Sequence, residues 1–292
     1  MNALLQASEL CYYLPGPAKV GVVRVGGDEV CLIDSGNDKS AGRAIRKELD
    51  ARDWRLRAIY NTHSHADHIG GNKYLQSQTG CRIYAPGAEL AFTRHPILEP
   101  SFLYGGYPGQ ELRGKFLLAA ESEAEPLTPA ALPAGFELLP LPGHSFDMVG
   151  FRTPDDVVFL ADSLASRATL EKYRICFIYD VAAYLRTLEV VQSMSARLFI
   201  PSHAEPTEDI APLARLNAEH VHATAATLLS LCRQPLSFEE LLQRLFNTYG
   251  LSLNFEQYVL AGSTLRSYLA WLSGSGRIAA TFADNRLLWA AC

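Results

Sequence analysis

An α/β layered fold followed by a small helical domain is the fold class that this 292-residue sequence predicts. Strand-like segments alternate with amphipathic segments between residues 20 and 85, and strand patterns return between residues 136 and 202. After Pro206 the pattern changes to three long helical segments and a hairpin. These observations predict a catalytic domain over residues 1–208 and a C-terminal domain over residues 209–292.

The first part of the chain contains two strands around a Gly-Gly-Asp turn, then a helix, a strand, a helix and a strand. In order, these are expected at residues 20–36, 38–53, 56–62, 68–80 and 81–85. The first helix is expected because Ala41, Ile45 and Leu49 are spaced to lie on one face. Gly80 is the expected end of the second helix.

Residues 94–135 lack a clean period and are rich in Gly, Pro and aromatic residues. Long irregular segments of this kind are often insertions that cover active sites. Strands are then expected at residues 136–141, 148–153, 157–161 and 197–202, with a helix at 181–194. The insertion and the strands around it complete the predicted catalytic domain.

The C-terminal residues predict helices at 209–232, 237–250 and 254–276. Ser237 and Glu240 form a capping-box pattern at the start of the second helix. Residues 276–291 predict a β-hairpin about Asp284 and Asn285. Helices followed by a two-stranded wing indicate a winged-helix-like unit.

Composition indicates a folded protein, with 48% hydrophobic and 20% charged residues. The net charge of −5 argues against a general affinity for nucleic acid or for an anionic membrane. The six cysteines show no CxxC spacing and are expected to be free thiols in a reducing cytoplasm. We expect a cytoplasmic protein, because residues 1–10 do not resemble a secretory signal and no run of about 18 apolar residues occurs.

The stretch NTHSHADHIGG, residues 61–71, gathers three of the eight histidines of the chain. In an extended His63-Ser64-His65 both imidazoles point the same way and can bind one cation together. Asp67 and His68 follow at the turn and can face a second cation nearby. Gly70 and Gly71 are expected to let the following helical turn pack closely against backbone.

Three further metal-competent residues follow later strand patterns. They are His144 in LPGHS, Asp162 in FLADS and His203 in IPSHAEP. Loops at strand ends are where rigid scaffolds present functional side chains. By contrast, His95, His220 and His222 are expected to be structural, and the last two lie two apart on a helix and point to different faces.

The run from His63 to His68, the ordered His144, Asp162 and His203, and Asp34 resemble the metallo-β-lactamase fold superfamily over Val20 to His203. The resemblance implies an αββα four-layer sandwich with two metal ions at one edge of its sheets. It implies that His63, His65 and His144 bind the first ion, that Asp67, His68 and His203 bind the second, and that Asp162 bridges them. Asp34 is then a neighbour of the ligands. Zinc is the default cation for such a hydrolytic site, with iron and manganese as alternatives.

The sequence is most similar to the glyoxalase II-like branch, which implies a small-molecule ester or thioester substrate. A hydroxide bridging two cations is the expected nucleophile, and Asp67 is expected to orient it and to pass a proton to the leaving group. Tyr104, Tyr107, Arg174 and Tyr179 are the expected substrate-binding residues. Arg113 and Lys115 are further basic residues of the insertion that are considered for this role.

Two other functions stay open at this level. A winged helix after this fold resembles endoribonuclease-like members, but the nearly balanced charges of the C-terminal helices and hairpin favour a packing or lid role over nucleic-acid binding. The second is an oxidoreductase of the sulfur dioxygenase type, because sulfur dioxygenases of the same fold use one iron. A homodimer is also plausible, because the insertion presents aromatic residues.

Overall fold

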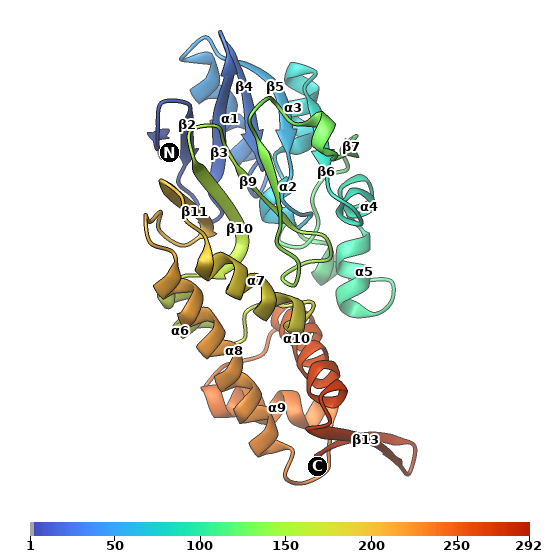
Figure 1. Ribbon diagram of the computed structural model, residues 1–292. Helices are drawn as coiled ribbons and strands as arrows, with labels where there is room; N and C mark the ends of the chain where they lie inside the picture. Colours follow the sequence, from blue (N-terminus) through green and yellow to red (C-terminus); the bar gives the residue numbers. More distant parts are fainter. Residues whose placement is uncertain (1–2) are drawn as a thin grey trace.

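The computed structural model describes residues 3–292 and is elongated, with two sheets at one end and the C-terminal helices at the other (Figure 1). The larger sheet has seven strands in sequence order. They are β1 (Leu5–Gln6), β2 (Cys11–Leu14), β3 (Val20–Gly26), β4 (Glu29–Ile33), β5 (Arg55–Tyr60), β6 (Arg82–Ala85) and β7 (Glu125–Pro126). The first four strands pair antiparallel, and β4 to β7 pair parallel.

The second sheet has four strands in the order β11-β10-β9-β8. They are β8 (Glu137–Pro140), β9 (Val149–Arg152), β10 (Val157–Ala165) and β11 (Leu198–His203). The helices of this part of the chain are α1 (Lys39–Asp50), α2 (Ala66–Ile69), α3 (Asn72–Thr79), α4 (Glu89–Arg94), α5 (Leu98–Tyr104), α6 (Arg167–Tyr173) and α7 (Val181–Ser193).

Side-chain alternation along β4 places the two sheets back to back. Val30 and Leu32 pack with Ile45 and Leu49 of α1 in the core on the outer face of the large sheet. Their neighbours Cys31 and Ile33 belong to a second core that includes residues of β9, β10 and β11. Because successive side chains of a strand point to opposite faces, one strand serves both cores.

The outer face of the small sheet packs against α7 and α8 (Ala211–Leu231). With α1 and α3 on the opposite side, the layers are helix, sheet, sheet and helix (Figure 1). This arrangement confirms the predicted αββα class. The face predicted for α1 is also confirmed at Ile45 and Leu49, and Asp38 caps that helix by accepting from Ser40 N and Ala41 N.

The C-terminal elements follow the predicted order. They are α8, β12 (Leu236–Ser237), α9 (Phe238–Tyr249), α10 (Phe255–Gly274), β13 (Ile278–Ala283) and β14 (Arg286–Ala291). The capping box of Ser237 and Glu240 is present, and Asp284 and Asn285 turn the hairpin with positive φ. The hydrophobic core under α7 and α8 continues into α9 and α10. A domain boundary at residue 209 and the winged-helix assignment stay predictions.

Several elements differ from the sequence-based expectation. The stretch from residue 94 to residue 135 is partly regular, because it contains α5, the 3-10 helices η1 (Gln110–Arg113) and η2 (Pro129–Ala131), and the edge strand β7. The short β1, β2, α4 and α6 were not expected from the sequence. The expected helix at residues 68–80 is divided into α2 and α3 at the two glycines. All six cysteines are free thiols, and no helix among residues 3–292 is long and apolar enough to span a membrane.

Candidate metal centre

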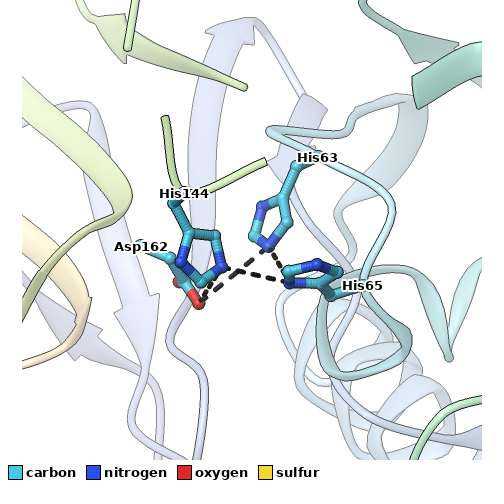
Figure 2. Close-up of side chains that lie close together, drawn as sticks. All are labelled: His63, His65, His144 and Asp162. Atoms are coloured by element: carbon cyan, nitrogen blue, oxygen red, sulfur yellow. Dashed lines mark hydrogen bonds and ion pairs between the residues drawn. The ribbon is translucent and has the colours of Figure 1, made fainter. Parts of the chain in front are cut away.

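Four side chains from three parts of the chain meet at the edge of the two sheets. They are His63 and His65 after β5, His144 after β8, and Asp162 in β10, and Figure 2 shows them pointing toward one another. His65 Nδ1 lies 3.0 Å from His63 Nε2 and 3.1 Å from His144 Nε2. Asp162 Oδ2 lies 3.4 Å from His144 Nε2 and 3.9 Å from His63 Nε2. The three histidines are the first ligand group, and Asp162 lies beside them.

The second ligand group consists of Asp67, His68 and His203, whose donor atoms also lie within 4.8 Å of one another. Asp67 Oδ2 is 3.4 Å from His203 Nε2 and 3.8 Å from His68 Nε2. The structure therefore brings together all seven residues that the sequence predicts as metal ligands.

Asp162 lies between the two groups. Besides facing the first group, its Oδ2 is 3.0 Å from His203 Nε2, and its Oδ1 is 3.1 Å from His68 Nε2. The preceding Ala161 has a φ of 50°, and the pairing of β10 with β11 shifts register on both sides of it. Such irregularities re-aim side chains at functional sites. The sequence placed Asp162 just after a strand, whereas it lies inside a longer, irregular one.

Backbone carbonyl groups orient two of the imidazoles. His144 Nδ1 lies 3.1 Å from Phe177 O, and His203 Nδ1 lies 2.7 Å from Pro17 O. Because a carbonyl oxygen can only accept, each Nδ1 donates a hydrogen to it, and each Nε2 is the nitrogen that faces the ligand groups. This is the arrangement that metal-binding histidines adopt.

Asp34 performs the same task for two more imidazoles. Its Oδ2 accepts from His68 Nδ1 at 2.8 Å and from the Thr62 hydroxyl at 2.8 Å, while Oδ1 accepts from Thr62 N at 2.8 Å. The Thr62 hydroxyl gives its single hydrogen to Asp34, so it accepts from His63 Nδ1 at 3.0 Å. The Nε2 atoms of His63 and His68 are thereby turned toward the ligand groups.

Replacing Asp34 by alanine is expected to weaken metal binding by about 10–100-fold, the usual effect of losing a partner behind a metal-binding histidine. The affinity is measured by competition with a chromogenic chelator. Asp28→Ala, at an exposed position before β4, is the control and should bind as the unmodified protein does. An affinity of Asp34→Ala equal to that of the control would contradict the orienting role.

Gly70 and Gly71 allow the segment with Asp67 and His68 to pack tightly against the end of β4. A Cβ on Gly71 would lie 2.3 Å from Ser35 O, and one on Gly70 would lie 2.3 Å from the carbonyl carbon of Asn37. Only glycine fits such close approaches of two backbones. The structure thus confirms the expectation that these glycines allow the following helical turn to pack closely against backbone.

The two groups differ in how they hold protons. Burial lowers the pKa of His65 to about 4 and that of His144 to about 3. These imidazoles are neutral at pH 7 and have free lone pairs. Burial also acts against protonation of His203, but the carboxylate of Asp162 outweighs it and raises the pKa of His203 to about 10. A cation entering the second group therefore displaces a proton from His203.

Both groups have the donor chemistry and the spacing that a metal ion requires. A tetrahedral ion with bonds of about 2.1 Å separates its ligands by about 3.4 Å, which is within the spacings of the first group together with Asp162. His68 Nε2 and Asp162 Oδ1 are buried and lie 3.1 Å apart, and within residues 3–292 neither atom has a hydrogen-bond partner besides this contact. Buried polar atoms with so few partners are costly, so a cation that contacts both atoms is a natural partner.

Two glutamates near the site were missed in the sequence. Glu89 is buried in α4 and accepts from Ser64 N at 3.0 Å, from the Ser64 hydroxyl at 2.5 Å, from the Ser145 hydroxyl at 2.6 Å and from Asp147 N at 3.2 Å. It thus joins the loop of His63 and His65 to the loop of His144. A glutamate in a short helix gives no sequence signal for such a role.

Glu99, the second missed residue, lies behind His65. Its Oε1 is 3.5 Å from His65 Nε2, the nitrogen that faces away from the first ligand group. Burial raises the pKa of Glu99 to about 8, and the nearby carboxylates of Glu89 and Asp67 add to the effect. Glu99 lies in α5, within the segment that was expected to be irregular, so the sequence offered no reason to place it near the site.

A cavity of about 150 Å³ opens over the ligand groups. Its polar lining includes His65, Asp67, Asp162 and Glu99. Asp67 is the most exposed of these carboxylates, with 37% of its side chain accessible. A small molecule in this cavity would therefore meet the Asp67 carboxylate.

The four residues that the sequence suggests for substrate binding lie apart from this lining. Tyr104 and Tyr179 line a separate open groove beside α10. Tyr107 is 74% exposed with the Arg113 guanidinium over its ring, and the backbone carbonyl of Arg174 accepts from His220 Nε2. Their role toward substrate stays a prediction.

Sequence comparison finds relatives that match part of the chain. The chain is 32% identical over 128 residues to a hydroxyacylglutathione hydrolase of Methylococcus capsulatus, a match that covers 44% of this chain and 41% of the relative. It is 25% identical over 188 residues to an atrochrysone carboxyl ACP thioesterase of Aspergillus fumigatus, covering 63% of this chain and 50% of the relative. The chain thus spans half or less of the length of these relatives.

Two solved structures resemble the whole fold. A beta-lactamase domain protein from Burkholderia ambifaria superposes with a TM-score of 0.77 at 17% identity, covering 99% of this chain and 94% of the other. A metallo-beta-lactamase family protein from Thermus thermophilus gives 0.73 at 19% identity, covering 99% and 97%. The family model described as the Metallo-beta-lactamase superfamily matches residues 13–203, a range that includes both ligand groups. The chain belongs to the metallo-beta-lactamase superfamily.

Proposed function

We propose that the protein is a dinuclear metal-dependent hydrolase that cleaves small ester- or thioester-like substrates. The observation that carries the proposal is the position of Asp162, whose two oxygens face imidazoles of both ligand groups at 3.0–3.9 Å. A carboxylate in that position suits two neighbouring cations, and zinc is the first choice for a site of histidines and carboxylates.

When bound, two such cations supply an activated water near neutral pH and polarise the bond under attack. The side chains of the chain itself provide position and charge. The imidazoles of the first group are neutral, which suits them to bind a cation without losing a proton. Burial opposes ionisation of Asp162, but His203 and His68 outweigh it and hold its pKa well below the ordinary value. Asp162 therefore remains a carboxylate.

Asp67 is the proposed proton carrier. Burial would raise its pKa, but the charges of His68 and His203 outweigh it, so the pKa is lowered. An ionised carboxylate that faces the cavity can orient an attacking water, accept its proton and deliver that proton to the leaving group. The names of the two relatives, a hydrolase and a thioesterase, support cleavage of an acyl bond.

Turnover by metal-depleted and reconstituted protein tests this function. The protein is incubated with dipicolinate, desalted, and assayed against acetyl and butyryl esters and thioesters before and after addition of Zn²⁺, Mn²⁺ or Fe²⁺. Hydrolysis should disappear on depletion and return with a cation. Unchanged hydrolysis by metal-free protein would contradict the proposal. Oxygen consumption with one iron per chain would instead favour a dioxygenase.

A further inference from the structure

One wall of the cavity over the ligand groups is apolar. It consists of Phe116, Leu117, Phe177 and Leu260, while the ligands and Glu99 supply the polar lining. Phe116 is 57% exposed, whereas Leu117 is buried. Leu260 belongs to α10, so the C-terminal part of the chain contributes directly to this cavity.

The apolar wall is held by a small core of its own. Leu117 packs with Leu103 and Leu112 of the same insertion and with Val259 of α10. Phe177 and Leu260 pack at the edge of this cluster. The wall therefore has fixed support from the insertion on one side and from α10 on the other.

Cationic side chains near the wall are directed elsewhere. Lys115 directly precedes Phe116, but its ammonium group pairs with Asp38 Oδ2 at 2.9 Å. The guanidinium of Arg113 lies over the ring of Tyr107. Among the residues of the described chain that line the cavity there is no lysine or arginine. An anionic group of a substrate would find no positively charged side chain on this wall.

We propose that the wall selects substrates with an uncharged, apolar group next to the cleaved bond, and that Phe116 and Leu260 determine this specificity. The inference rests on the proposed hydrolase function and deepens it. A hydrolase that requires an anionic group next to the cleaved bond would have the opposite substrate preference. The apolar group belongs either to the acyl part of the substrate or to its leaving group, and both would meet the same wall.

The size of the cavity limits the apolar group. An apolar cavity of about 150 Å³ can hold a molecule of the size of benzene, so this cavity has room for an apolar group of roughly six carbon atoms. Each methylene transferred from water to an apolar wall should raise kcat/KM about fourfold. Lengthening an acetyl group to butyryl adds two methylenes and should thus raise kcat/KM about sixteenfold.

Two series of thioesters test the inference. In the first, the leaving group is N-acetylcysteamine and the acyl group is acetyl, propionyl, butyryl, hexanoyl or succinyl. In the second, acetyl is fixed and the leaving group is an uncharged alkanethiol of two to six carbons. If kcat/KM rises with chain length in one series, the part of the substrate varied in that series is the part that contacts the wall. Succinyl should react at least tenfold more slowly than butyryl, because its terminal carboxylate would be buried against the wall.

Phe116→Ala and Leu260→Ala should each lower the ratio of butyryl to acetyl turnover, or the corresponding ratio of the second series, by at least fourfold. Phe116 is exposed, so its variant keeps the core intact. The matched control is Phe282→Ala, an 80% exposed phenylalanine of the β13 strand, which should keep the ratio unchanged. The inference would be overturned if the ratio of long-chain to short-chain turnover were near one in both series, or if neither substitution changed that ratio. Hydrolysis itself would remain established in either case.

Binding without turnover separates the two proposals. Saturation-transfer NMR with hexanamide, an uncharged probe, should give a signal that weakens in Phe116→Ala and Leu260→Ala and persists in Phe282→Ala. If no thioester is hydrolysed but hexanamide follows this pattern, the hydrolase proposal fails and the apolar site stands. If hexanamide binds all three variants equally, the site itself is refuted.

Discussion

Replacing Asp67 by asparagine is expected to lower kcat by about 10²–10⁴-fold, the usual contribution of a positioned acid or base. Asparagine keeps the shape and one oxygen of the side chain, but it cannot accept a proton and carries no charge. The half-exposed position of Asp67 beside the cavity means that the fold should tolerate the change. Turnover of the best thioester and metal content are measured on the same preparation.

Asp284→Asn is the control for this substitution, because it makes the same chemical change at the exposed tip of the C-terminal hairpin. Asp284 has a positive φ, which asparagine also tolerates. The control should keep full activity. A kcat of Asp67→Asn within a factor of three of the unmodified protein would rule out Asp67 as the proton carrier.

Replacing Glu89 by glutamine is expected to lower the free energy of unfolding by about 1–3 kcal/mol, since a buried acceptor is lost from its donors. The amide NH₂ would face either the donors of Ser64 or those of Ser145 and Asp147, and these groups would lose a bond. Because Glu89 joins two ligand-bearing loops, we also expect the first ligand group to bind its cation about 10–100-fold more weakly.

Urea unfolding of metal-free protein isolates the first effect, and chelator competition on the folded protein measures the second. Glu121→Gln, at an exposed position of the insertion, controls for the loss of one negative charge. It should leave both quantities within error of the unmodified protein. A Glu89→Gln variant with normal stability and normal metal affinity would show that the bonds between the two loops are dispensable.

The sequence predicted which seven side chains come together at the candidate metal centre, because their signals are local. His63 to His68 are contiguous, His144 follows β8, and His203 is the last residue of β11. Period and capping signals likewise located α1, α9 and the hairpin about Asp284 and Asn285. In each case a short stretch contains the information that determines the structure.

Contacts between distant segments could not be predicted in this way. The partner of Glu89 across 56 residues is Ser145, and that of His203 across 186 residues is a carbonyl of Pro17. A carboxylate or a carbonyl has no pattern that identifies its distant partner. The same holds for Leu260, which looks like an ordinary core leucine of a helix until α10 is placed beside the cavity.

The most direct test of the central claim is anomalous diffraction at the zinc edge from crystals of the protein reconstituted with zinc. Two peaks are predicted, one enclosed by His63, His65 and His144 and the other by Asp67, His68 and His203, with Asp162 in contact with both. Fully occupied zinc in the first position with none in the second would contradict the dinuclear site. Absence of zinc from both positions would contradict the metal centre altogether.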